Sequence, residues 1–312
     1  MILGRTGIEV TELCFGALPM GPLQKNMDTE SAASVVQAAL NGGISFIDTA
    51  QIYGTYKPIK KALDRTGLKP VIASKSNSAE YGSMEDAVYE ALEMLGLDVI
   101  DIFHLHAARG DKTLYKKRAG AFKALCDLRE KGKIKAAGVS CHSPELASLS
   151  ADIGEIDVVY PLVNYKGMGI IGTLEEMISA IDKCSRKGKG IYLMKVLAGG
   201  NLAEKYGKAL GFVRSLGSYP VSLGMVSERE VDYNLRYFNS QRPDAIADPT
   251  FNDFNKRFHV VQIACRGCGN CADVCASSAI EIKDNKASID CGRCIMCGYC
   301  VGSCPAMAIR PV

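Results

Sequence analysis

The sequence predicts an α/β protein in which a closed barrel of eight parallel strands, a (β/α)8 barrel, is followed by a small C-terminal domain. Over residues 1–240, eight short apolar runs alternate with longer amphipathic segments, as expected for parallel strands joined by helices. Residues 259–312 carry two groups of cysteines with the same spacing, which indicates a second unit with its own chemistry. Residues 241–258, rich in Pro, Asp, Asn and Phe, are interpreted as a connector whose three phenylalanines dock this unit on the barrel.

The composition fits a globular protein of about two domains. The chain has 312 residues, of which 47% are hydrophobic, and a formal net charge of +3. This charge is small and dispersed, and no basic cluster is interleaved with aromatic residues, so we expect no nucleic acid partner. No apolar run approaches the ~20 residues of a membrane span, and the first residues lack the regions of a signal peptide. We therefore expect no membrane association and a cytoplasmic location.

The elements of the predicted barrel follow in a regular order. The opening segment, residues 4–11, is expected to form a hairpin that closes the barrel floor. Apolar residues at helical spacing, such as Val88 and Leu92, lie between the strands, and Ser227 with Glu230 has the spacing of a capping box. The predicted strands begin at Cys14, Ile44, Val71, Ile100, Ile134, Val158, Gly190 and Pro220.

Four polar residues stand where a barrel of this kind carries its chemistry, at the C-terminal ends of the strands. Asp48 ends the second predicted strand, and Tyr53 lies on the loop after it. Lys75 ends the third strand and His106 the fourth. Taken singly, Asp48 could be a helix cap and Lys75 a rim charge, but four such residues at one mouth favour a catalytic site. His104, deeper on the same strand face, is expected to be a packed, hydrogen-bonded histidine.

Four segments of the predicted barrel closely resemble motifs of the aldo-keto reductase family: FIDTAQIYG, IASK, DIFHLH and GVSCHSPE. The resemblance covers residues 1–240 and implies a catalytic tetrad for carbonyl chemistry. Tyr53 would protonate a carbonyl oxygen, and His106 would orient it. Lys75, held by Asp48, would lower the pKa of Tyr53, since a phenol with a pKa near 10 is otherwise a poor acid–base catalyst.

The resemblance also implies a nicotinamide site, but its residues depart from the family pattern. Ser140 is retained on the fifth strand, whereas Cys141 replaces the usual Asn and Tyr160 stands at the position of a Gln. These changes leave open whether a nicotinamide binds. The other predicted nucleotide contacts are Lys195, Gly199 and Gly200 after the seventh strand, where barrel phosphate sites commonly form, and Gly224, Glu230 and Asn234.

The phosphate end of this site favours NADH over NADPH. Gly224 and Glu230 stand where NADP-binding members of the family have Lys and Arg. A carboxylate there would repel a 2′-phosphate and could accept a hydrogen bond from a free ribose hydroxyl. A capping role in the last barrel helix explains Glu230 at least as well.

The C-terminal cysteines form two C-x2-C-x2-C-x3-C runs that lie 29 residues apart, and Gly269 recurs at the same distance as Gly298. Zinc would require separated pairs of cysteines around one tetrahedral ion, and disulfides would require an oxidising compartment. Eight thiols in this spacing therefore favour iron–sulfur clusters. The cysteines are Cys265, Cys268, Cys271 and Cys275, repeated as Cys294, Cys297, Cys300 and Cys304.

These runs resemble the bacterial two-cluster ferredoxin family, whose fold is a small α+β domain. The resemblance implies two 4Fe-4S clusters in which the fourth cysteine of each run binds the other cluster. Ala276 replaces the usual Pro after the first run and removes no ligand, and Cys291 is predicted to be a spare thiol. One predicted ligand set is Cys265, Cys268, Cys271 and Cys304, and the other is Cys294, Cys297, Cys300 and Cys275.

The predicted function is an oxidoreductase of aldo-keto reductase type that acts on a small carbonyl compound, with electron transfer through the clusters. An external redox partner for the ferredoxin-like domain is also expected. Clusters pass single electrons and nicotinamides pass a hydride, so two routes remain open. Either NAD(P)H binds and the clusters are structural, or the clusters feed the substrate, which the altered nicotinamide contacts favour. The alternative function is an electron carrier whose barrel is only a docking body.

Overall fold

The computed structural model describes residues 1–250 and 257–311, and its larger part is a closed parallel barrel. The strands neighbour one another in the order β7-β6-β5-β4-β3-β2-β1-β8. A parallel bridge between Leu193, just after β7, and Val221 of β8 closes the barrel. The predicted (β/α)8 fold is therefore confirmed. The strands are β1 Leu13–Gly16, β2 Phe46–Asp48, β3 Val71–Ser76, β4 Ile100–Ala107, β5 Ile134–Cys141, β6 Val158–Pro161, β7 Gly190–Ile191 and β8 Val221–Gly224.

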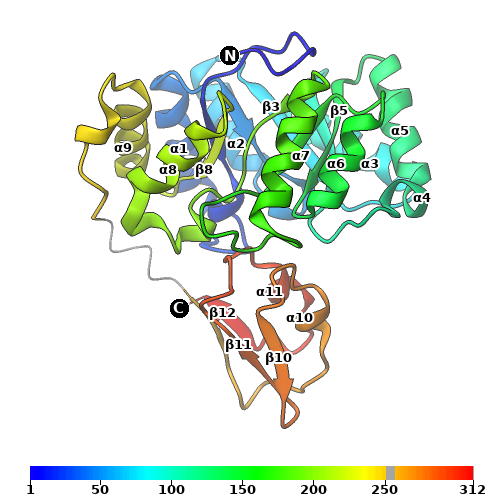
Figure 1. The fold of residues 1–312 in the computed structure, drawn as a ribbon, viewed down its shortest axis with the longest axis vertical. Helices are drawn as coiled ribbons and strands as arrows, with labels where there is room; N and C mark the ends of the chain where they lie inside the picture. Colours follow the sequence, from blue (N-terminus) through cyan, green and yellow to red (C-terminus); the bar gives the residue numbers. More distant parts are fainter. Residues whose placement is uncertain (251–256, 312) are drawn as a thin grey trace.

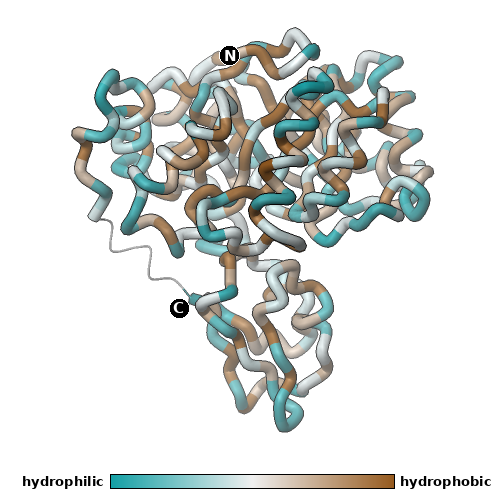
Figure 2. Tube along the Cα trace, viewed as in Figure 1, coloured by the Kyte–Doolittle hydropathy of each residue, from teal (hydrophilic) through white to brown (hydrophobic). Residues whose placement is uncertain are grey.

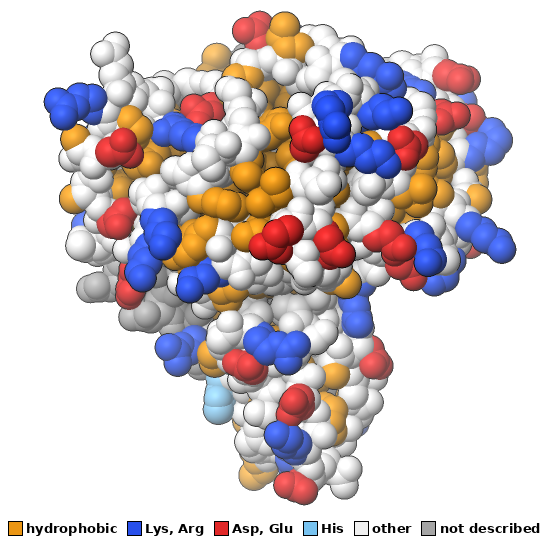
Figure 3. Space-filling model, viewed as in Figure 1, with side chains coloured by type: hydrophobic (Ala, Val, Ile, Leu, Met, Phe, Trp, Pro, Cys, Tyr) orange, Lys and Arg blue, Asp and Glu red, His pale blue; other side chains and the backbone are white. Residues whose placement is uncertain are grey.

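Helices surround the strands, and the C-terminal domain lies against one end of the barrel (Figure 1). Charged side chains of both signs are interspersed on the face that Figure 3 shows. Within the described ranges, no helix combines the length and the apolar character that crossing a membrane demands. The barrel helices are α1 Thr29–Asn41, α2 Tyr56–Thr66, α3 Tyr81–Leu95, α4 Leu114–Lys117, α5 Ala119–Glu130, α6 Pro144–Asp152, α7 Leu174–Arg186, α8 Tyr206–Ser215 and α9 Glu228–Asn239.

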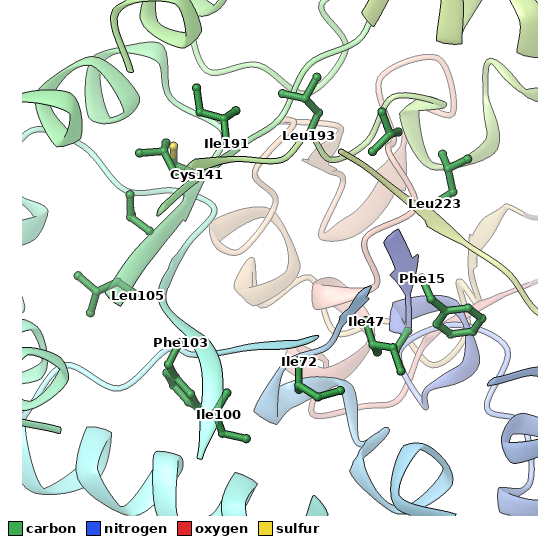
Figure 4. Packing of buried hydrophobic residues seen from close by; sticks show 14 of the residues in the cluster. Phe15, Ile47, Ile72, Ile100, Phe103, Leu105, Cys141, Ile191, Leu193 and Leu223 are labelled. Carbon is green, nitrogen blue, oxygen red and sulfur yellow. The ribbon is translucent and has the colours of Figure 1, made fainter. Parts of the chain in front are cut away.

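Side chains alternate along each strand, so the barrel has an outer and an inner core. Phe15 and Phe103 belong to the outer core, between strands and helices (Figure 4). Their chain neighbours Cys14 and Ile102 belong to the inner core. Figure 2 shows the hydrophobic residues concentrated along the strands in the middle of the barrel. Burial on both sides explains why the strands are continuous apolar runs in the sequence.

The opening segment forms the predicted hairpin, with an antiparallel bridge between Ile2 and Glu9. Leu3 is 1% exposed and packs in the inner core. In Figure 1 the N-terminus lies at the end of the barrel opposite to the C-terminal domain. The hairpin therefore covers the floor, and the catalytic mouth faces the C-terminal domain.

Residues 257–311, called the C-terminal module below, form a small α+β unit in which β9 pairs with β12 and β10 with β11. Each of its two helices follows a glycine with positive φ, 86° at Gly269 and 80° at Gly298. Glycine adopts this conformation without the steric cost of a Cβ, which explains why it recurs in the repeat. The elements are β9 Phe258–Val260, α10 Asn270–Asp273, β10 Ile280–Lys283, β11 Lys286–Ile289, α11 Tyr299–Ser303 and β12 Ile309–Pro311.

The first part of the predicted connector runs along the barrel. Tyr233 donates its hydroxyl to Ala247 O at 2.9 Å. Phe258 packs in the core of the module rather than against the barrel, and Phe251 and Phe254 lie outside the described residues. The prediction that phenylalanines of the connector dock the module thus does not hold for Phe258. The boundaries 1–240, 241–258 and 259–312 stay predictions.

Candidate active site

Two residues of the predicted tetrad form a buried ion pair at the barrel mouth. Asp48 at the end of β2 is 3% exposed, and Lys75 on β3 is 1% exposed. Lys75 Nζ donates to the two carboxylate oxygens of Asp48 at 2.8 and 2.7 Å, and to Thr49 O at 2.7 Å. All three ammonium protons therefore have partners, as a buried charge requires.

Asp48 is also held by two tyrosines from neighbouring strands. Tyr192 donates to Asp48 Oδ1 at 3.0 Å, and Tyr160 donates to Oδ2 at 3.4 Å. The two tyrosine rings stack with centroids 3.8 Å apart. His104 Nε2 and the Tyr192 hydroxyl lie 2.8 Å apart, so His104 is the packed, hydrogen-bonded histidine that we expect. Tyr192 is not predicted as a site residue from the sequence. The feature that could have identified it is its polar hydroxyl within the seventh apolar run.

Tyr53 lies on the short 3-10 helix Gln51–Tyr53 that follows β2. Lys75 Nζ is 4.7 Å from the centroid of its ring. Burial raises the pKa of Tyr53 well above its usual value, and the neighbouring Tyr299 and Asp48 add to this shift. The predicted lowering of this pKa by Lys75 is not found, because Asp48 neutralises the ammonium charge and the phenol is removed from water. Tyr53 is therefore a protonated phenol.

His106, near the end of β4, faces Tyr53 edge-on with ring centroids 5.9 Å apart. Burial lowers the pKa of His106 well below its usual value, and the charge of Lys75 acts in the same direction. The imidazole is therefore neutral near pH 7. Its Nδ1 is buried and has no hydrogen-bond partner among the described residues.

A further aromatic residue of this site comes from the C-terminal module. The hydroxyl of Tyr299, the first residue of α11, lies 2.7 Å from His106 Nε2, and it also interacts with the Tyr53 hydroxyl. Sequence reasoning misses Tyr299 because it stands between two cysteines of the repeat. One signal is that Tyr299 breaks the repeat, since its counterpart in the first run is Asn270.

The module is docked on the mouth through its second cysteine run. Ile295 is 1% exposed and packs with the inner core of the barrel. Asn201 Nδ2 donates to Cys294 O at 2.8 Å. A Cβ on Gly199 would lie 2.1 Å from Ile295 O, so the absence of a side chain at Gly199 permits this close approach. The module therefore forms one wall of the site.

A cavity of about 180 Å³ opens beside Tyr53, between the mouth and the module. Asp48, Tyr53 and Met296 line it. Its other walls come from β6, from the loops after β7 and β8, and from the start of α9, which are far apart in the sequence. Six of the predicted nucleotide contacts line this cavity, and they are Tyr160, Lys195, Gly199, Gly200, Gly224 and Glu230.

The structure does not bring the other three predicted nucleotide contacts to this cavity. Ser140 lines a smaller neighbouring cavity, where its Oγ is buried with no partner in the described chain. Cys141, the next residue of β5, points the other way into the outer core (Figure 4), because side chains alternate along a strand. Asn234 is held within the helix layer, where its Nδ2 donates to Glu230 O at 2.8 Å and its Oδ1 accepts from Tyr206.

Glu230 has the capping role that the sequence suggests, with a different partner. Its Oε2 accepts from Val226 N at 2.7 Å, and its own N–H donates to Ser227 Oγ at 3.3 Å. The carboxylate thus stabilises the turn into α9 while it also lines the large cavity. The two explanations of Glu230 are therefore compatible.

The cysteines of the two runs are interleaved. Burial raises the pKa of Cys271, and Cys265 and Cys304 add to the shift, which makes these thiols neighbours across the two runs. Within residues 1–250 and 257–311, no three His, Cys, Asp or Glu side chains are arranged to hold a single metal ion. One cavity is lined by Cys265, Cys268, Cys271 and Cys304. Burial also raises the pKa of Cys300, and the charges of Cys297, Cys294, Cys275 and Cys271 add to this shift.

Backbone N–H groups point at three of these sulfur atoms. The distances are 3.3 Å from Ala287 N to Cys265 Sγ, 3.2 Å from Ala279 N to Cys275 Sγ and 3.3 Å from Ala308 N to Cys304 Sγ. Hydrogen bonds of this kind stabilise negative sulfur and tune the potential of a cluster. The donor set therefore fits iron–sulfur ligation.

The second cysteine run lies beside the tetrad. Cys297 lines the smaller cavity together with Lys75 and His106. The cavity that Cys265, Cys268, Cys271 and Cys304 line is instead bounded by residues of the module alone. Of the two cysteine groups, the one that contains Cys297 is therefore the one next to the barrel.

A parallel barrel with its polar mouth covered by a cysteine-rich module is the architecture of a barrel oxidoreductase with an attached iron–sulfur domain. Sequence comparison supplies the family. The chain belongs to the aldo/keto reductase family, which it matches over residues 12–217. Residues 264–308 match the 4Fe-4S dicluster domain.

Curated relatives match part of the chain. L-galactose dehydrogenase from Arabidopsis thaliana is 27% identical over 218 residues, which are 65% of this chain and 66% of that protein. An aldo-keto reductase from Mycobacterium sp. (strain KMS) is 35% identical over 123 residues, 38% of this chain and 42% of that protein. The chain thus spans less than two thirds of the length of either relative.

Solved structures share the fold. An aldo-keto reductase from Bacillus halodurans in its holo form has a TM-score of 0.64 at 19% identity, and the match covers 77% of this chain and 91% of that one. The Bombyx mori aldo-keto reductase in complex with NADP has a TM-score of 0.59 at 17% identity, with 77% and 88% covered. At this identity the likeness establishes the barrel and carries no residue roles.

Proposed function

We propose that the protein reduces a small carbonyl compound at the barrel mouth, with Tyr53 as general acid and His106 as the group that orients the carbonyl. The observation that carries this proposal is that Tyr53 and His106 face each other beside the buried Asp48–Lys75 pair. A barrel that served only to dock a carrier domain would not need a buried ion pair next to a phenol. The electron-carrier alternative is therefore weaker.

Tyr53 donates its hydroxyl proton to the carbonyl oxygen as negative charge develops there. The resulting tyrosinate is stabilised by Lys75, whose Nζ lies 4.7 Å from the ring centroid. Asp48 holds Lys75 in place through both carboxylate oxygens. Neutral His106 donates from Nε2 to the same oxygen and fixes the carbonyl in line with Tyr53.

The large cavity is the site where a nicotinamide nucleotide would bind, and the bound nucleotide would supply a hydride. Lys195 and the glycines of the loop after β7 would hold its phosphates. The unpartnered Oγ of Ser140 lines the smaller neighbouring cavity and takes no part in this nucleotide site. Cys141 and Asn234 are excluded from this site by their positions in the outer core and the helix layer.

The module would hold its two clusters with crossed cysteine sets, Cys265, Cys268, Cys271 and Cys304 in one and Cys275, Cys294, Cys297 and Cys300 in the other. The cavity that the first four cysteines share supports this assignment. Clusters supply or remove single electrons. Because the ligands are thiolates that must stay unpaired, we place the protein in a reducing compartment, the cytoplasm.

A second route, in which the clusters pass single electrons to the substrate, is favoured by the position of Cys297. This residue lines the smaller cavity with Lys75 and His106.

Deuterium tracing separates hydride transfer from single-electron transfer. The protein is mixed anaerobically with benzaldehyde and NADH that carries deuterium at the transferable position. Deuterium on the benzylic carbon of the alcohol supports hydride transfer. A second reaction uses dithionite-reduced protein in D2O without NADH. If this reaction gives the alcohol and its benzylic deuterium comes only from D2O, single electrons from the module are the source. Absence of alcohol with both reductants would reject carbonyl reduction of this substrate.

NADH is expected to bind at least as tightly as NADPH, because Glu230 lines the large cavity and its charge repels a 2′-phosphate. Glu230→Gln keeps an oxygen for Val226 N and removes the charge, so it should raise the affinity for NADPH by about threefold to tenfold and leave that for NADH nearly unchanged. Isothermal titration of both nucleotides measures the effect. A clear preference for NADPH in the unaltered protein would contradict this prediction.

The turnover rate is expected to be nearly constant between about pH 7 and pH 9. Burial raises the pKa of Tyr53 above its usual value of 10.0 and lowers that of His106 below 6.5. Tyr53 thus stays protonated, as an acid must, and His106 stays neutral over this range. A steady-state pH profile with an inflection between these limits would show that another group titrates in the rate-limiting step.

A further inference from the structure

The hydroxyl of Tyr299 lies where the proposed reaction needs the oxygen of its substrate. It is 2.7 Å from His106 Nε2 and interacts with the Tyr53 hydroxyl. These are the two groups that would hold a carbonyl oxygen. The ring of Tyr299 packs edge-on against His106, with centroids 5.8 Å apart.

Tyr299 leaves almost no room for a substrate on the His106 side of the site. The cavity that His106, Ser140 and Tyr299 line has a volume of about 20 Å³. A space of this size holds about one water molecule. The larger cavity reaches Tyr53, but neither His106 nor Tyr299 lines it. A carbonyl compound can therefore contact Tyr53 and His106 together only if the side chain of Tyr299 moves.

The main chain of Tyr299 is held in place. A Cβ on the preceding Gly298 would lie 2.3 Å from Leu23 O, so the module and the barrel are in close contact there. Gln24 Nε2 donates to Met296 O at 2.5 Å on the same side. Because these contacts hold the backbone just before Tyr299, rotation of the Tyr299 side chain is the smallest movement that frees the oxygen position.

We propose that Tyr299 is a specificity-determining residue that occupies the oxygen position of the active site and is displaced by substrate. This rests on the proposed function of Tyr53 and His106. The space that the side chain vacates has the size and shape of a phenol. The favoured substrates are therefore planar carbonyl compounds of about one ring, and they compete with a residue supplied by the iron–sulfur module.

Phenol binding to Tyr299→Ala tests the oxygen position without any turnover. The substitution removes the ring, so phenol should bind at least tenfold more tightly to this variant than to the unaltered protein. Toluene, which has the same shape and no hydroxyl, should bind at least fivefold more weakly than phenol, since two hydrogen bonds are lost. Calorimetry on anaerobic protein with its full iron content measures both. Equal binding of phenol and toluene would overturn the proposal.

Tyr299→Phe tests whether the Tyr299 side chain competes with the substrate for the oxygen position. It also replaces the alanine variant as the test if that variant does not fold. It retains the ring and loses the hydroxyl that holds it at His106. Benzamide, a planar carbonyl compound that is not reduced, should bind about fivefold more tightly to this variant than to the unaltered protein. Unchanged benzamide affinity would reject displacement of Tyr299. If these binding results hold while no carbonyl compound is turned over, the proposed function fails and the position of Tyr299 stands.

Discussion

Tyr53→Phe is expected to lower the rate of carbonyl reduction by roughly 10²- to 10⁴-fold, the usual effect of losing a general acid. The change keeps the ring, its packing and its contact with Lys75, and it deletes only the proton donor. The iron content should stay unchanged, because Tyr53 is not a cluster ligand. Steady-state turnover under anaerobic conditions, with iron measured on the same samples, gives the result.

Lys75→Met provides the matched comparison for this prediction. It removes the cation that stabilises the tyrosinate and leaves Asp48 as a buried charge whose remaining partners are the hydroxyls of Tyr192 and Tyr160. Turnover should fall, and the protein should also lose stability. Because Tyr53 and Lys75 act on the same proton transfer, the double variant should be little slower than the slower single variant. Additive losses, or full activity in Tyr53→Phe, would place the chemistry elsewhere.

Cys275→Ser is expected to remove one complete cluster, so that iron falls from about eight to about four atoms per chain. Cys275 belongs to the first run, but its charge adds to the raised pKa of the buried thiol of Cys300 in the second run. If ligation is crossed, Cys275→Ser and Cys297→Ser lose the same cluster and leave the same electron paramagnetic resonance spectrum. Cys265→Ser should leave a different spectrum. Identical spectra for Cys275→Ser and Cys265→Ser would show that each run binds its own cluster.

Cys291→Ser is the control for this series. Cys291 lies three positions before the second run and is predicted to be a spare thiol. Its Sγ lies 4.0 Å from Ile289 O. The iron and sulfide content of this variant should equal that of the unaltered protein. Loss of iron would mean that the second run begins one cysteine earlier than the repeat implies.

Strand periodicity made the barrel and part of the site predictable from the sequence. Asp48, Lys75 and His106 each stand at or near the end of an apolar run, and parallel strands bring such positions to one mouth. The same rule explains the error at Cys141. It follows Ser140 on one strand, and alternation turns the next side chain to the opposite face. The predicted lowering of the Tyr53 pKa is also not found, because the burial of that phenol depends on the module that covers it.

The sequence by itself determined the elements whose signal is local: the order of strands and helices, the tetrad at the strand ends and the two cysteine runs. Only the tertiary structure decided what the module does to the barrel. The contact between His106 and Tyr299 joins residues 193 positions apart. It depends on how Ile295 and Gly298 fit against the mouth, which is a property of two packed surfaces. A periodic pattern or a ligand spacing carries no information about such a fit, because it describes neighbours along the chain and not the shape of a distant partner.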